Sequence, residues 1–258
     1  MPHRVEQAIF TSQRGERMAG YQLTSRSPGI DNETAVLLSN WGPAHDAIET
    51  RLARSSASLF VIDGDRICIS FTQLAGAEYS GRSGGRVYTH SFVLPLDALA
   101  PFQFNPFLIL RAFRSAGRTQ PRREPPETLE SFQLVGRASR SNVATQVAQH
   151  FFDEPTCEKL IWALAAEQPV YIAGDECLDG AIEAVLQLPG EHDRAAVSFA
   201  TGLKISPRRP FQLQAVPLDQ VLLRQLQRNE HALMVQLPSR HGSPTRDTKS
   251  VSRTSRHG

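Results

Sequence analysis

Two runs of β-branched and aromatic residues flank a short turn in the N-terminal half of the chain, and this arrangement constrains the fold more than any other feature. The first run ends at Asp63, the turn follows at Gly64 and Asp65, and the second run ends at Thr72. Strand-forming residues on both sides of such a turn predict an antiparallel hairpin over residues 58–72. We therefore expect the core to be built around an antiparallel sheet.

Further strands and helices are predicted throughout the chain, in no simple alternation. In the first half, strands are predicted over 5–11, 20–25 and 87–94, and helices over 31–38, 44–54 and 107–113, with Asp31 and Asn105 at the start of the first and last helix. In the second half, helices are predicted over 142–151, 155–166, 179–188 and 219–229, and strands over 169–173, 196–201, 211–216 and 232–235. The mixture predicts an α+β fold with mainly antiparallel sheets flanked by helices.

The chain is predicted to divide near residue 118. Residues 115–130 are rich in Arg, Pro and Glu, and the prolines block regular structure. We expect two mixed α/β domains: an N-terminal α+β domain over 1–118, a linker over 119–139 and a middle α+β domain over 140–236. A disordered basic tail is expected over 237–258, because it is too polar to fold alone.

The cysteines and the apolar stretches indicate the compartment. Cys68, Cys157 and Cys177 are an odd number without CxxC spacing, which argues against a disulfide framework and a thiolate zinc site. The first residues carry charges where a signal peptide needs an apolar core. Since no stretch is apolar enough to span a bilayer, we expect a cytoplasmic protein without membrane contact.

Basic residues are concentrated in the tail. Residues 237–258 hold five of the 28 lysines and arginines and one of the 26 acidic residues, so the rest of the chain has a slight acidic excess. The arginines between Arg111 and Arg123 stand beside glutamates and are not interleaved with aromatic residues. Nucleic-acid binding through this stretch and the tail therefore remains an alternative hypothesis that the charge pattern disfavours.

A glycine-rich loop supplies the candidate binding residues. Successive amides around Gly81, Gly84 and Gly85 can form a concave anion site, and Arg82 and Arg86 can neutralise the anion. The spacing matches no known phosphate-loop motif, and a strand rather than a helix follows, so a plain flexible turn is the simpler interpretation. The candidate binding residues are Arg82, Arg86, Tyr88 and His90, the last two on one face of the predicted strand 87–94.

Three residues are candidates for catalysis, although no catalytic motif accompanies them. His90 could act as a general base if a carboxylate such as Asp63 converged on it, but a packed, hydrogen-bonded histidine is the simpler interpretation. Cys157 lies in the first turn of a predicted helix, where the helix dipole lowers a thiol pKa. The other histidines are scattered at spacings that do not suit a metal. We expect no cofactor and no metal.

Several short blocks taken together resemble one known family. They lie at residues 7–12, 20–30, 81–94, 188–201 and 211–213. Their order is similar to that in the N-terminal and middle domains of the bacterial GTPase-associated protein family. The resemblance implies an adaptor or effector whose partner is a GTPase-like protein encoded beside it in predicted biological-conflict systems. It supplies no catalytic residues for this sequence.

Three functional hypotheses follow. The leading one is a non-enzymatic adaptor that presents a sheet edge or a helix face to the switch region of a GTPase-like partner. The alternative is a hydrolase or nucleotide-processing enzyme built around His90, Arg82, Arg86 and Asp63, which requires these side chains to converge in one pocket. The nucleic-acid hypothesis above is the third.

Overall fold

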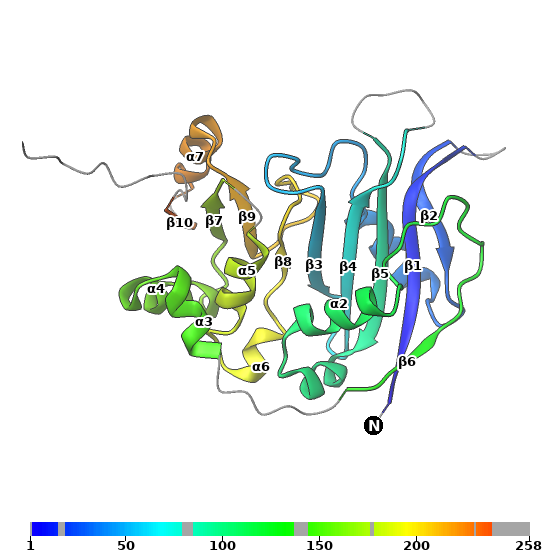
Figure 1. The fold of residues 1–258 in the computed structure, drawn as a ribbon, viewed down its shortest axis with the longest axis horizontal. Helices are drawn as coiled ribbons and strands as arrows, with labels where there is room; N and C mark the ends of the chain where they lie inside the picture. The colour runs from blue at the N-terminus through cyan, green and yellow to red at the C-terminus, as the bar shows by residue number, and fades with distance from the viewer. Residues whose placement is uncertain are drawn as a thin grey trace, which may run out of the picture.

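The computed structural model describes residues 2–14, 19–78, 85–136, 144–175, 178–229 and 231–238, and its strands form one continuous sheet (Figure 1). The strands are β1 (His3–Arg14), β2 (Ala19–Arg26), β3 (Ser55–Val61), β4 (Arg66–Leu74), β5 (Val87–Pro95), β6 (Phe132–Leu134), β7 (Val170–Gly174), β8 (Phe199–Ala200), β9 (Leu213–Pro217) and β10 (Leu233–Gln236). The helices are α1 (Asn32–Trp41), the 3-10 helix η1 (Leu96–Phe102), α2 (Pro106–Ser115), α3 (Ala144–Phe151), α4 (Glu154–Ala165), α5 (Asp179–Leu186), α6 (Glu191–Arg194) and α7 (Gln220–Gln227).

The strand order across the sheet is β10-β7-β9-β8-β3-β4-β5-β1-β2, with β6 paired to one end of β1. All pairs among β1 to β6 are antiparallel, and so is the pair of β3 with β8. The pairs within β7 to β10 are parallel. The predicted α+β class with a mainly antiparallel sheet is therefore confirmed, and the parallel strands are a feature that the sequence pattern did not predict.

The sheet crosses the predicted boundary between the two halves. Ser58 and Leu59 of β3 pair with Ala200 and Phe199 of β8. Inside the predicted linker 119–139, the strand β6 pairs with β1. The division into two domains stays a prediction. One continuous sheet runs through both halves of the chain.

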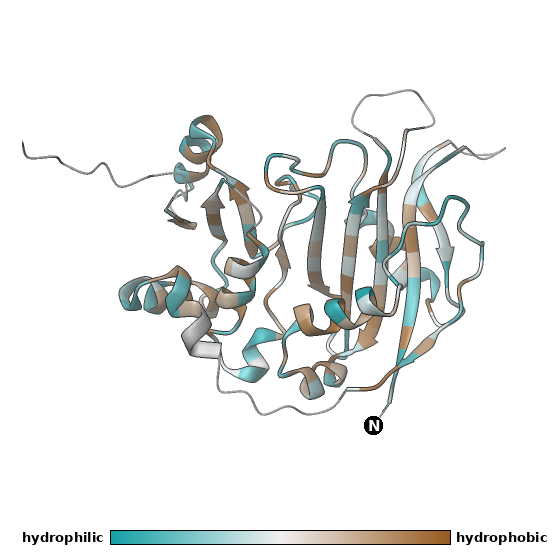
Figure 2. Cartoon of the chain, in the orientation of Figure 1, coloured by the Kyte–Doolittle hydropathy of each residue, from teal (hydrophilic) through white to brown (hydrophobic). Residues whose placement is uncertain are grey.

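The central strands are buried on both faces because a helix covers each. Successive side chains along β3, β4 and β5 alternate between the two faces of the sheet, and Figure 2 shows apolar bands along β3 and β4. One set, Phe60, Cys68 and Val93, packs with Leu38 of α1. The other set packs with α2 in the main core, and it includes Leu59, Ile69 and Phe92.

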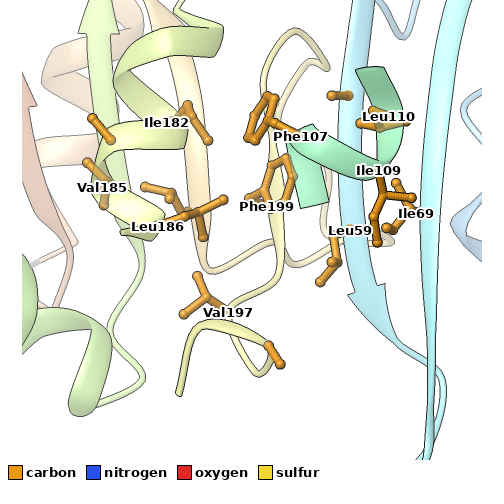
Figure 3. Packing of buried hydrophobic residues seen from close by; sticks show 14 of the residues in the cluster. Leu59, Ile69, Phe107, Ile109, Leu110, Ile182, Val185, Leu186, Val197 and Phe199 are labelled. Carbon is orange, nitrogen blue, oxygen red and sulfur yellow. The ribbon is translucent and has the colours of Figure 1, made fainter. Parts of the chain in front are cut away.

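The main core continues from α2 into the second half. Phe107 of α2 stacks on Phe199 of β8 with ring centroids 5.2 Å apart, and side chains of α5 lie on the far side of this pair (Figure 3). These residues belong to one cluster with the buried positions of β7 and β9. Burial of a shared apolar surface on this scale holds the halves together.

Most of the predicted elements are present, including the hairpin and the starts of two helices. Asp63 accepts hydrogen bonds from the backbone N–H groups of Asp65 and Arg66, which closes the turn between β3 and β4. Asp31 and Asn105 cap α1 and α2 by accepting from Thr34 N and Phe107 N. The predicted tail, apart from residues 237 and 238, lies outside the described residues.

The predicted helix over 44–54 is wrong. Asp46 has a left-handed backbone with φ of 59°, which interrupts a right-handed helix. Ile48 instead forms a bridge with Leu203, and Glu49 N donates to Gly202 O at 2.8 Å. The apolar residues that suggested a helix are buried, but against the loop that follows β8.

Candidate functional site

His90 lies in the middle of β5 under a packed aromatic layer. It is 2% exposed, and its ring stacks on Phe92 with centroids 4.4 Å apart. The side-chain amide of Gln7 donates to Glu130 O, so its oxygen faces His90 Nε2 at 3.0 Å. An amide oxygen only accepts, and therefore Nε2 donates and Nδ1 is unprotonated.

Burial lowers the pKa of His90 to about 4, and the positive charge of Arg122 adds to the effect. Among the described residues, His90 Nδ1 and Tyr88 Oη make no hydrogen bond of normal geometry, although the backbones of Arg118 and Arg122 lie near them. Tyr88 is 0% exposed, and burial raises the pKa of its phenol. Both side chains are thus neutral and enclosed, in the environment of packed core residues.

The guanidinium of Arg86 connects the end of β4 to the segment that contains Arg122 and Arg123. Its Nε donates to Ala75 O at 3.1 Å, and its terminal nitrogens donate to the carbonyls of Arg122 and Arg123 at 3.4 Å. Arg82 and residues 81–84 of the predicted anion loop lie outside the described residues. In the described structure, Arg86 therefore has a structural role, because it joins the end of β4 to the segment that contains Arg122 and Arg123.

The three catalytic candidates lie apart. His90 pairs across the ladder with Phe71, whereas Asp63 lies beyond Arg66, five residues or about 17 Å further along β4. Asp63 is bound to the guanidinium of Arg66 at 2.8 Å, which holds its pKa below the usual range. The described structure does not bring Asp63 to His90.

Cys157 lies on α4, in the other half of the chain. Burial, and then the negative charges of Asp153 and Glu154, raise its pKa, and the assignment of Cys157 as a catalytic residue stays a prediction. A raised thiol pKa disfavours a nucleophile at neutral pH.

The arginine-rich stretch turns partly inward. Arg111 pairs with Glu183 on α5, Arg114 lies over the ring of Phe71, and Arg118 lies over Phe132. Arginines engaged in this way are less available to phosphates of a nucleic acid. In the part of the chain that the structure describes, no three His, Cys, Asp or Glu side chains gather in a geometry that could hold a metal ion.

A groove runs between β2, the last strand of the sheet, and α1. It has a volume of about 540 Å³, and its lining includes Leu23 and Thr24 of β2, and Ala35 and Val36 of α1. Val36 is 61% exposed, so the wall of the groove includes an apolar side chain that is open to solvent. We call this feature the β2–α1 groove.

A second hollow of about 770 Å³ adjoins the groove and shares Leu23, Ser39 and Asn40 with it. Its lining adds Tyr21 and Gln22 of β2 and the consecutive residues Arg208 and Arg209 from the loop after β8. We call it the arginine hollow. Strands from the first half and a loop from the second half thus meet at one surface.

Tyr21 in the arginine hollow is part of a buried polar cluster. Its hydroxyl donates to Glu78 Oε2 at 2.7 Å and accepts from Val87 N at 3.0 Å, while Ser12 donates to the other oxygen of Glu78. Burial raises the pKa of Tyr21, and the hydrogen bond to Glu78 adds to this. The hydroxyl is therefore occupied, and only the ring is available to line the hollow.

Sequence reasoning missed both the groove and the hollow. Gln22, Asn40 and Arg209 are separated by up to 187 positions and form no motif. A signal for Arg209 existed in Ser206-Pro207-Arg208-Arg209, since proline at the second position predicts a turn. That signal places the arginines on a turn but does not indicate where the turn packs.

None of the helices among the described residues is both long and apolar enough to cross a membrane. The fold and the separated candidates define an α+β protein with a continuous, mostly antiparallel sheet and open grooves at the β2 end. Residues 4–131 match the model of the family described as GTPase-associated protein 1, N-terminal domain type 2, which confirms the predicted resemblance to a GTPase-associated protein family. A search of curated proteins finds none that matches the chain.

Proposed function

We propose that this protein is a non-enzymatic adaptor that binds a GTPase-like protein through β2 and the β2–α1 groove. The family, whose name associates it with a GTPase, matches residues 4–131. This segment contains β2 and α1 with the groove between them. The single observation that carries the proposal is the coincidence of the family segment with this open sheet end.

The end of the sheet suits a partner strand. Among the strands that the structure describes, β2 pairs with β1 on one side and none pairs with it on the other. On this open side, the backbone hydrogen bonds between described residues reach only the last residue of β2, because Arg26 N donates to Glu127 O and Arg26 O accepts from Leu129 N. An edge of this kind binds an extended segment by main-chain hydrogen bonds, while the groove supplies side-chain contacts.

The test is binding to the GTPase-like protein encoded beside this one, loaded with GDP or with a non-hydrolysable GTP analogue. We expect a complex whose affinity differs between the two nucleotide states, since regulation requires differential affinity. Val36→Asp places a charge in the groove and should weaken the complex about 10-fold or more. The matched control is Trp162→Ala on α4, which removes a side chain that is 77% exposed and lies outside the family segment.

Two results would overturn the proposal. One is the absence of a complex with either nucleotide. The other is a complex that tolerates Val36→Asp but is lost in Trp162→Ala, which would move the interface to the second half of the chain. Equal affinity in both nucleotide states would support binding of the GTPase-like protein but would exclude regulation of this binding by the nucleotide.

A further inference from the structure

Arg209 is a charged side chain buried without a counter-ion. It is 9% exposed, and its Nε is buried without a hydrogen-bond partner. Within the described residues, its guanidinium makes neither an ion pair nor a side-chain hydrogen bond. Arginine stays protonated even when burial lowers its pKa, so a full positive charge lies at the wall of the arginine hollow.

The backbone fixes this arginine in place. Arg209 N donates to Ser206 O at 3.0 Å across the turn, and Phe211 N donates to Arg209 O at 2.9 Å. Phe211 is 6% exposed and packs edge-on to Trp41, with ring centroids 5.1 Å apart. The backbone of Arg209 is therefore held in a turn beside the buried ring of Phe211.

Three carboxylates on neighbouring segments, those of Asp46, Glu49 and Glu78, are engaged elsewhere. Asp46 pairs with Lys204, and Glu49 pairs with Arg51. Glu78 accepts from the hydroxyls of Ser12 and Tyr21. Burying an isolated charge costs free energy. The unpaired guanidinium of Arg209 is therefore explained by an anionic ligand that pairs with it.

We propose that the arginine hollow binds the phosphate group of a small phosphorylated molecule through Arg209 and Arg208. The guanidinium fork matches phosphate oxygens in a bidentate geometry. Two adjacent arginines balance the charge of about −1.5 to −2 on a phosphate monoester at neutral pH, whereas a carboxylate carries half as much. Gln22, Ser39 and Asn40 line the same hollow and add polar contacts for the rest of the ligand.

The volume of about 770 Å³ lies in the range of small-molecule sites. The ring of Tyr21 and the side chain of Leu23 give this hollow an apolar wall beside its polar groups. This site goes beyond the proposed interface, because it needs the loop after β8, which lies outside the family segment. Its test needs only the full chain and no protein partner.

The test measures binding of inorganic pyrophosphate. The chain has two tryptophans, so Trp162→Phe leaves Trp41 as the sole indole reporter beside the hollow. In this background we expect pyrophosphate to change the emission and to raise the melting temperature, with weaker binding as salt increases. Arg209→Gln should weaken binding about 10-fold or more, and Arg208→Gln should weaken it less. The control Arg224→Gln removes one exposed charge from α7 and should leave binding unchanged.

The variant Arg209→Met tests whether Arg209 binds a ligand or only stabilises the fold. Removing a buried, unpaired charge should keep or raise the melting temperature without ligand while abolishing the shift that pyrophosphate causes. Arg208 is exposed, so Arg208→Gln is expected to fold even if the changes at Arg209 do not. It therefore still reports whether the hollow binds pyrophosphate. Circular dichroism confirms that each variant is folded.

The proposal is overturned if pyrophosphate leaves the unsubstituted chain unchanged, or if Arg224→Gln loses as much binding as the two hollow variants. Parallel titrations with inorganic phosphate and with ADP and GDP distinguish the source of the phosphate. Tighter binding of one nucleoside diphosphate than of pyrophosphate identifies a nucleotide. Equal binding identifies recognition of the phosphate end alone.

Discussion

Glu183 of α5 accepts from both terminal nitrogens of Arg111 on α2, at 2.7 and 2.9 Å. Asn105, the cap of α2, donates to the same carboxylate at 2.7 Å. These three residues join a helix of the first half to a helix of the second half over the core. The pair is bidentate, and the Glu183 side chain is 20% exposed, so the interaction is stronger than a typical surface ion pair.

We predict that Glu183→Gln lowers the free energy of unfolding by about 1–3 kcal/mol. Burial raises the pKa of Glu183, but the hydrogen bonds from Arg111 and Asn105 outweigh it and hold the pKa below its usual range. A depressed pKa stabilises the fold above about pH 4.3, the unfolded value, and this contribution is lost as pH falls further. Urea unfolding between pH 3 and pH 7 would check both effects. Equal stability of variant and parent at pH 7 would contradict them.

His90 should make the fold sensitive to mild acid. Its folded pKa of about 4 lies below the unfolded value of about 6.5, so the unfolded chain takes up a proton first as pH falls. Stability is full above pH 6.5 and falls by roughly 1.4 kcal/mol per pH unit between about 6.5 and 4.

The measurement compares His90→Gln with the parent across that interval. The variant has a lower stability overall, but its pH dependence should be flatter by the slope given above. The exposed His231 is the control, and His231→Gln should keep the slope of the parent. Identical slopes in all three proteins would mean that His90 is protonated in the folded state.

Gly202 has no room for a side chain. A Cβ there would lie 2.7 Å from the backbone oxygen of Ser55, which cannot rotate away. We predict that Gly202→Ala costs about 1–3 kcal/mol of stability. Gly64→Ala is the matched control, because its Cβ would meet nothing within 4 Å. Thermal unfolding should give a lower melting temperature for Gly202→Ala than for Gly64→Ala. Similar melting temperatures would show that the backbone at the β3–β8 junction moves to make room for the Cβ atom.

Cys68 should be unreactive in the folded protein. It is 0% exposed, and burial raises the pKa of its thiol to about 11, so about one molecule in a thousand carries the thiolate at pH 8. With maleimide labelling and peptide mass spectrometry, we expect Cys68 to react only on unfolding. The half-buried Cys157 should be modified earlier. Early labelling of Cys68 would indicate local opening of β4.

Local chemistry explains which parts of the fold were predictable. The hairpin at Asp63 and the cap at Asp31 depend on neighbours within three residues, and both were predicted. The segment around Ile48 failed because its partner, Leu203, lies 155 positions away. An apolar run shows that residues are buried but not what buries them.

The same distinction applies to the site. The interpretation of His90 as a packed, hydrogen-bonded histidine needed only the pattern of β5, and the geometry agrees with it. Arg209 carries no such local pattern, since its burial depends on β2 and α1 folding against a distant turn. The assignments of Arg82 and the 81–84 loop stay predictions.

The two-residue pairing of β8 with β3 has a consequence during synthesis. Leu59 emerges from the ribosome about 140 residues before Phe199, which at about 5–20 residues per second is a delay of about 7–28 s. During that time one side of β3 has no neighbour and offers its amides to any other nascent chain. A polypeptide limited to the family segment would keep this edge permanently open. Such a fragment should therefore self-associate more strongly than the full chain.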